Sequence, residues 1–186
     1  MTDLDILRQM IKDSARIELV DSYDKKKVEL AESQQTNSSV TVLGLPDDTI
    51  VIKADAFASP KSVFNDLQGE CKRADFIIVT SDGDRKTIIC IEMKVGKGET
   101  EAEIIKQLKG AKCFIVYCRE IGRSFWGAPS FLDDYTYRFV SIRESSIAKR
   151  RTRPDLQTGV HDQPDKMLKL LGKGSFQYNR LVGSSR

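Results

Sequence analysis

Two apolar stretches decide the fold: RADFIIV at residues 73–79 and IICIEMK at residues 88–94. Both are rich in residues that favour strands, and the SDGD segment between them, residues 81–84, has the composition of a turn. The sequence therefore predicts a β-hairpin. The near-continuous apolar run over residues 88–91 is typical of a central strand that is covered on both faces.

Charged residues cluster at one end of this predicted hairpin. In antiparallel strands the start of the first lies beside the end of the second, so Asp75 and Glu92 are expected to share one edge. Side chains alternate along a strand, which places Glu92 and Lys94 on the same side. Two carboxylates and an ammonium that converge on one spot are unfavourable unless a divalent metal or a substrate phosphate offsets them. We therefore take this edge as the candidate site.

The segments before the hairpin predict shorter elements. A cap at Thr2 and helical spacing of apolar residues predict a helix over residues 3–12. The strands expected at residues 40–45 and 49–54 flank Pro46-Asp47-Asp48, which predicts a second hairpin. Ser59-Pro60 is expected to start a short helix that runs to about Leu67.

A long amphipathic helix is predicted after the hairpin. Thr100 is its expected N-cap, with Glu103 three residues later. Its buried stripe is expected to consist of Ile104, Leu108, Ala111 and Ile115. Gln107 falls on the same stripe, so its amide is expected to face the sheet. Helical spacing favours a helix that continues to about Gly122, whereas the β-branched residues leave a strand from about Lys112 as the alternative.

The remaining chain predicts a strand at residues 135–142, a short helix at 164–171 and a last strand at 175–182. We expect one domain over residues 1–186, with a core at about 40–142 and a basic C-terminal extension at 143–186. That extension holds ten Lys/Arg and four Asp/Glu residues. Its KRRTR segment, residues 149–153, suits either contacts to a DNA backbone or an ordinary solvated turn.

Composition excludes several classes of protein. The 186 residues are 40% hydrophobic and 31% charged, as in a soluble globular protein, and no run approaches the ~20 apolar residues of a membrane span. The acidic N-terminus lacks a signal region, which predicts a cytoplasmic protein without membrane contact. Four cysteines without C-x-x-C spacing and the single His161 argue against structural zinc, and we expect reduced thiols.

Phosphodiester hydrolysis is the chemistry that best suits the candidate site. It needs a metal as Lewis acid, an activated water and positive charge near the developing phosphorane. Asp75 and Glu92 offer the oxygen ligands that Mg²⁺ prefers. Lys94 is expected to orient or help deprotonate the attacking water. Glu70 can supply a further carboxylate for a second metal.

This arrangement resembles the PD-(D/E)XK nuclease superfamily: an aspartate, then E-x-K across a hairpin, then a helix with an inward glutamine. The resemblance covers residues 67–118, about a quarter of the chain. It implies a restriction-endonuclease-like α/β/α core, with a central mixed β-sheet flanked by helices. It also implies a deoxyribonuclease that uses Mg²⁺ or Mn²⁺, more often an endonuclease than an exonuclease, and often a homodimer.

The resemblance also implies roles for individual residues. Asp75 and Glu92 correspond to the two metal ligands and Lys94 to the catalytic lysine. Glu70 is similar to the helix-borne acid found upstream in many members, and Gln107 to the glutamine of a Q-x-x-x-Y pattern. Two positions depart from the family: Ala74 stands where proline often precedes the aspartate, and Ala111 stands where the tyrosine would be.

Two alternatives stay open at this point. Asp75 can be a simple strand cap, and Glu92 and Lys94 an exposed ion pair on an edge strand, which contributes little to stability. A chain with this fold can also be catalytically silent and act as a nucleic-acid or protein-binding module. His161, alone in a polar segment, predicts no catalytic role.

Overall fold

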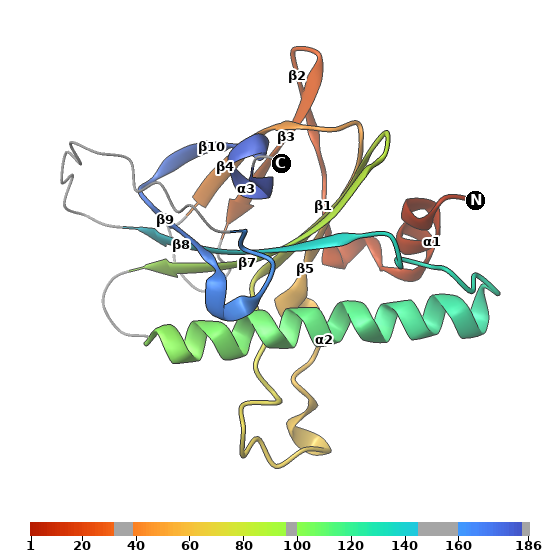
Figure 1. Cartoon of the computed structure of the whole chain (residues 1–186), viewed down its shortest axis with the longest axis vertical. Coiled ribbons are helices and arrows are strands. Elements are labelled where there is room, and N and C mark those ends of the chain that lie inside the picture. The colour runs from red at the N-terminus through yellow and green to blue at the C-terminus, as the bar shows by residue number, and fades with distance from the viewer. Residues whose placement is uncertain (32–38, 96–99, 145–159, 184–186) are drawn as a thin grey trace.

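The computed structural model describes residues 1–31, 39–95, 100–144 and 160–183 and shows a mixed α/β protein built on two mixed β-sheets (Figure 1). The helices are α1 (Asp3–Met10), α2 (Glu101–Phe125) and α3 (Tyr178–Val182), with short 3₁₀ turns η1 (Asp13–Ala15), η2 (Ala54–Ala56), η3 (Pro60–Ser62) and η4 (Pro164–Lys166). The strands are β1 (Arg16–Ile17), β2 (Val20–Ser22), β3 (Lys25–Ala31), β4 (Ser39–Leu45), β5 (Asp48–Lys53), β6 (Phe76–Asp82), β7 (Arg85–Val95), β8 (Thr136–Glu144), β9 (Leu168–Leu171) and β10 (Gly174–Gln177).

The predicted hairpin at residues 73–94 is confirmed as β6 and β7. The two strands pair antiparallel from Phe76↔Ile91 to Asp82↔Arg85. Gly83 stands in the two-residue turn with φ of +58°, a conformation that glycine adopts without strain. On its other edge β7 pairs in parallel with β8. Residues 88–91 are fully buried, as expected of a central strand.

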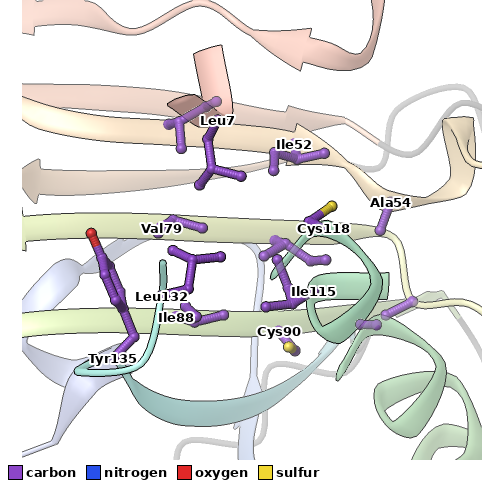
Figure 2. Close-up of a cluster of buried hydrophobic side chains, with 14 of the residues drawn as sticks. Leu7, Ile52, Ala54, Val79, Ile88, Cys90, Ile115, Cys118, Leu132 and Tyr135 are labelled. Atoms are coloured by element: carbon purple, nitrogen blue, oxygen red, sulfur yellow. The ribbon is translucent and has the colours of Figure 1, made fainter. Parts of the chain in front are cut away.

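The six-stranded sheet, in the order β1-β5-β6-β7-β8-β9, is covered on both faces. Side chains on one face pack with α1 and α2 into a first hydrophobic cluster, part of which Figure 2 shows around Leu7, Ile88 and Ile115. On the other face they pack with the four-stranded sheet, β10-β4-β3-β2, and with α3. The predicted α/β class with a central mixed sheet is confirmed, and the second face carries a sheet as well as a helix.

Helix α2 runs as one 25-residue helix, so the alternative of a strand from Lys112 is excluded. The Thr100 hydroxyl accepts a hydrogen bond from the Glu103 amide at 3.3 Å, as expected of an N-cap. The predicted stripe is confirmed, since Ile104, Leu108, Ala111 and Ile115 are all buried against the sheet. This helix therefore forms the cover of the sheet face on which the candidate site lies.

The predicted second hairpin over residues 40–54 is wrong. Strand β4 pairs with β3 and β10 in the four-stranded sheet, whereas β5 pairs with β1 and β6 in the six-stranded sheet. Pro46 and Asp47 thus carry the chain from one sheet to the other. A short polar segment between two apolar strands has the same composition in a hairpin as in a connection between two sheets. Only the long-range pairing of the strands distinguishes the two arrangements.

Both predicted short helices are also wrong. The first is only the turn η3, and the second is the turn η4 followed by β9. The last predicted strand ends at Gln177 as β10 and continues as α3. In each case the segment is too short for its own propensity to decide the structure, so neighbouring strands decide it.

The C-terminal residues 160–183 complete both sheets. Strand β9 extends the larger sheet in parallel to β8, and β10 pairs in parallel with β4. The basic KRRTR segment at 149–153 lies outside the described residues. Within the described ranges, no helix is both long and apolar enough to cross a bilayer. The four cysteines are free thiols, with Cys113 exposed and the other three buried.

His161 is buried and ties the C-terminal helix to the larger sheet. Its Nε2 atom donates to the carbonyl oxygen of Leu181 at 2.6 Å, while its own carbonyl accepts from Phe139 of β8 at 2.9 Å. Burial first of all, and then nearby Arg138, lower the pKa of His161, against the opposing effects of the Leu181 hydrogen bond and of Asp162. The folded state therefore favours the neutral imidazole.

We expect the protein to lose stability as the pH falls below about 6.5, the ordinary pKa of histidine, and the His161→Gln variant to lose less. Because the pKa of the folded form is lowered, the unfolded chain binds the proton first, and the stabilisation present above pH 6.5 is lost on acidification. Urea unfolding at about pH 7.5 and pH 5.5 measures both losses. Equal losses of unfolding free energy in wild type and His161→Gln would show that His161 is not the cause of the pH dependence.

Candidate functional site

The candidate site lies at one end of the β6–β7 hairpin, on the face of the sheet that α2 covers. Asp75 directly precedes β6, and Glu92 and Lys94 lie near the end of β7. Cys90 packs in the cluster beneath α2, so alternation places Glu92 and Lys94 on that same face. The Met93 amide donates to Asp75 Oδ2 at 2.7 Å. Asp75 and Glu92 therefore lie side by side, as the predicted register requires.

Glu92 and Lys94 form a buried ion pair. The Glu92 side chain is 0% exposed and that of Lys94 only 17%, and Lys94 Nζ lies 2.5 Å from Glu92 Oε1. Because β7 is the third of four consecutive long strands in the sheet rather than an edge strand, the alternative of an exposed surface pair is wrong. Removing two charges from water is unfavourable unless their geometry and further interactions compensate. This position is thus a poor place for a pair that has only a structural role.

The neighbouring strand β8 adds two polar residues that the sequence reasoning missed. In the parallel register Glu92 lies opposite Ser141, and Lys94 opposite Arg143. Register partners project to the same face of a sheet, so Ser141 and Arg143 flank the acid and the lysine. Ser141 is buried and Arg143 is half-buried. The strand itself was predicted, but nothing in the sequence specifies its parallel register with β7.

Gln107 lies on α2 between the buried residues Ile104 and Ala111 and points its amide oxygen inward, as predicted. This oxygen, Oε1, is buried and has no hydrogen-bond partner within the described part of the chain. A buried acceptor of this kind destabilises a fold by about 1–3 kcal/mol. Such an oxygen can accept a hydrogen bond from a water or a ligand, or it can coordinate a cation.

Glu70 is not brought to the other two acids. Its carboxylate is exposed and accepts hydrogen bonds from the amides of Leu67 at 3.1 Å and Gln68 at 2.8 Å. Backbone hydrogen bonds, that of its own amide first and then those of Gln68 and Leu67, lower the pKa of Glu70. Its carboxylate thus stabilises its own turn, in a segment that is not helical.

The donor set fits one hard cation. Across the described ranges, no three Asp, Glu, His or Cys side chains are grouped so that they could hold a metal together. Two adjacent carboxylates, Asp75 and Glu92, are nevertheless a sufficient protein contribution for Mg²⁺, which keeps several water ligands and commonly uses one or two carboxylates. A second metal held through Glu70 finds no support in this arrangement.

Comparisons with protein-family models, with curated proteins and with solved structures find no match to this chain.

Proposed function

We propose that this protein is a cytoplasmic Mg²⁺- or Mn²⁺-dependent deoxyribonuclease of the PD-(D/E)XK type. The observation that carries the proposal is the meeting of Asp75, Glu92 and Lys94 at one end of a central hairpin, with Glu92 buried and Lys94 nearly so. The order of elements supports it as well: the β6–β7 hairpin carries Asp75 and the E-x-K residues, and α2 with Gln107 follows. The free cysteines suit a reducing compartment.

The metal site of the proposal consists of Asp75 and Glu92. The Met93 amide donates to Asp75 Oδ2 at 2.7 Å, which orients the carboxylate beside Glu92. A divalent cation bound there supplies Lewis-acid stabilisation and acidifies a coordinated water. The buried Glu92 carboxylate gains a second positive charge beside it, which offsets the unfavourable burial of its own charge.

The basic residues of the proposal act on the phosphate and the attacking water. Hydrolysis joins the water oxygen to phosphorus and breaks one phosphorus–oxygen ester bond, and the proton lost by the water ends on the leaving oxygen. In this proposal Lys94, which pairs with Glu92, holds that water and stabilises charge on the phosphoryl oxygens. Arg143, opposite Lys94 on β8, adds a second cation on the same face. The buried Gln107 Oε1 on α2 can accept a hydrogen bond from a water.

Asp75→Asn is expected to reduce Mg²⁺-dependent cleavage of a circular plasmid by about 100-fold to 1,000-fold, because it removes one of two anionic ligands. A circular substrate reports endonuclease action. Asp84→Asn is the matched control, since Asp84 is an exposed aspartate in the turn at the other end of the same hairpin. It should cleave like wild type. Equal cleavage by all three proteins would indicate a contaminating nuclease, and an inert wild type with both metals would contradict the proposal.

A catalytically silent nucleic-acid or protein-binding module is the second candidate function. The observation in its favour is that Glu70 remains engaged in its own turn, so the predicted three-acid set is not assembled. Titration calorimetry with Mn²⁺ separates the two functions. A nuclease binds the metal, and Asp75→Asn weakens that binding. A silent module shows no difference between wild type and variant.

A further inference from the structure

A row of polar residues crosses four neighbouring strands of the larger sheet at the candidate site. It starts with Asp75, directly before β6, and Glu92 on β7. The parallel registers continue it to Ser141 on β8 and Lys169 on β9. The residues on either side of Ser141 and Lys169 in the chain pack with the four-stranded sheet. Alternation therefore places both side chains on the opposite face, the one that α2 covers.

A side-chain contact independently places Lys169 on this face. Its Nζ atom donates to Oε2 of Glu101 at 2.7 Å, and Glu101 stands in the first turn of α2. Neighbouring strands lie about 4.8 Å apart, so the Cα atoms of Glu92 and Lys169, two strands apart, are separated by ~10 Å. Lys169 therefore stands at the rim of the candidate site, on the side away from Asp75.

The charge of the row changes sign from one end to the other. The β6–β7 half holds the two carboxylates, whereas the β8–β9 half holds the Ser141 hydroxyl and the Lys169 ammonium. Two residues further toward the strand ends, Lys94 lies opposite Arg143. Carboxylates suit a hard cation, and ammonium and hydroxyl groups suit phosphate oxygens. This polarity therefore fits a metal ion at one end of the row and a phosphate at the other.

The partner of Lys169 is one that a phosphate can replace. The Lys169 side chain is 48% exposed and that of Glu101 is 55% exposed. Ion pairs in such a solvated setting contribute little to stability, unlike the buried pair of Glu92 with Lys94. A phosphate group offers the same charge-assisted hydrogen bond as the Glu101 carboxylate. Exchange of one partner for the other therefore leaves the lysine paired throughout.

We propose that Lys169 binds a backbone phosphate of the DNA that is cleaved at Asp75 and Glu92, and that Glu101 is the partner it leaves when DNA binds. The inference rests on the proposed function and gives the substrate a direction. The cleaved strand runs across the sheet, from the metal at β6 and β7 toward β9. Because Lys169 is two strands from Glu92, the phosphate that it holds is next to the scissile phosphate along the backbone.

The test measures binding of a fluorescein-labelled DNA duplex by anisotropy, in the Asp75→Asn background, which keeps the DNA intact. Lys169→Met is expected to weaken binding by about threefold to tenfold and to lower the slope of log affinity against log salt by about one, the loss of one phosphate contact. Glu101→Gln is expected to strengthen binding by about twofold to fivefold, since it removes the competitor. That gain should vanish in the Glu101→Gln/Lys169→Met double variant, because the two residues act through each other.

A matched pair of controls lies on the four-stranded sheet. Lys26 of β3 forms an ion pair with Asp21 of β2, whose side chain is 82% exposed. This sheet packs on the other face of the larger sheet. Lys26→Met and Asp21→Asn change the net charge by the same amounts as Lys169→Met and Glu101→Gln. Both controls should leave the affinity and the salt slope unchanged.

Three outcomes would overturn the phosphate contact. They are the absence of DNA binding, a Lys169→Met variant with the affinity and salt slope of its parent, and an equal loss in Lys26→Met, which would report net charge alone. A Glu101→Gln gain that persists without Lys169 would overturn the exchange of partners.

Plasmid cleavage by proteins that retain Asp75 reports on the proposed function separately. An inert protein whose DNA binding depends on Lys169 removes the nuclease and keeps the phosphate contact. Cleavage with an unchanged KM in Lys169→Met does the reverse. If both inferences hold, Lys169→Met raises KM by about the factor by which it weakens binding, and Lys26→Met leaves KM as it is.

Discussion

Lys94→Met is expected to lower the free energy of unfolding by about 3–5 kcal/mol at neutral pH, the range for breaking a buried ion pair from one side. Glu92 is fully buried, and Lys94 Nζ lies 2.5 Å from its carboxylate. The methionine fills similar volume but leaves this carboxylate in the sheet without its nearest cation. Urea unfolding followed by circular dichroism measures the loss in the absence of divalent metal.

A matched control for Lys94 lies on the same strand. Lys86 of β7 pairs with Asp134 at 3.7 Å, and the Asp134 side chain is 79% exposed. Such surface pairs contribute about 0–1 kcal/mol, so Lys86→Met should change little. The double variant Glu92→Gln/Lys94→Met should recover most of the loss, because it removes the buried charge as well. If Lys94→Met destabilises no more than Lys86→Met, the buried pair does not have the strength assigned to it.

Gly110→Ala is expected to destabilise the protein by about 1–3 kcal/mol, although alanine is the better helix former by about 1 kcal/mol. A Cβ at residue 110 would lie 1.9 Å from the carbonyl oxygen of Lys72. This obstacle is backbone, so either α2 or the segment at Lys72 and Arg73 must move. Because Asp75 follows three residues after Lys72, such a shift also disturbs the candidate site. Urea unfolding measures the change in stability.

Cys113→Ala serves as the control for Gly110→Ala. Cys113 lies one turn further along α2 and is exposed, so its replacement should change stability by no more than about 0.5 kcal/mol. A stabilised Gly110→Ala variant would show that helix propensity outweighs the close approach. The expected loss would instead show that Gly110 is needed where α2 crosses the chain on its way to Asp75.

Features that depend on local chemistry could be predicted from the sequence. Alternating and apolar patterns with a glycine turn specify the β6–β7 hairpin, and an N-cap with a helical stripe specifies α2. Antiparallel register then places Asp75 beside Glu92 without further information. These residues lie close in sequence or on one hairpin, so the alternation of side chains along the strands and the geometry of the turn suffice to bring them together.

Features that depend on partners far away in the chain could be read only from the tertiary structure. It separates β4 and β5 into two sheets, makes β9 a strand, and brings Ser141 and Arg143 beside Glu92 and Lys94. It also shows that the Glu70 carboxylate accepts a hydrogen bond from the Gln68 amide of its own turn, and that the Glu92–Lys94 ion pair is buried. Strand pairing between segments far apart in the chain is selected by packing and burial, and no local sequence pattern contains that information.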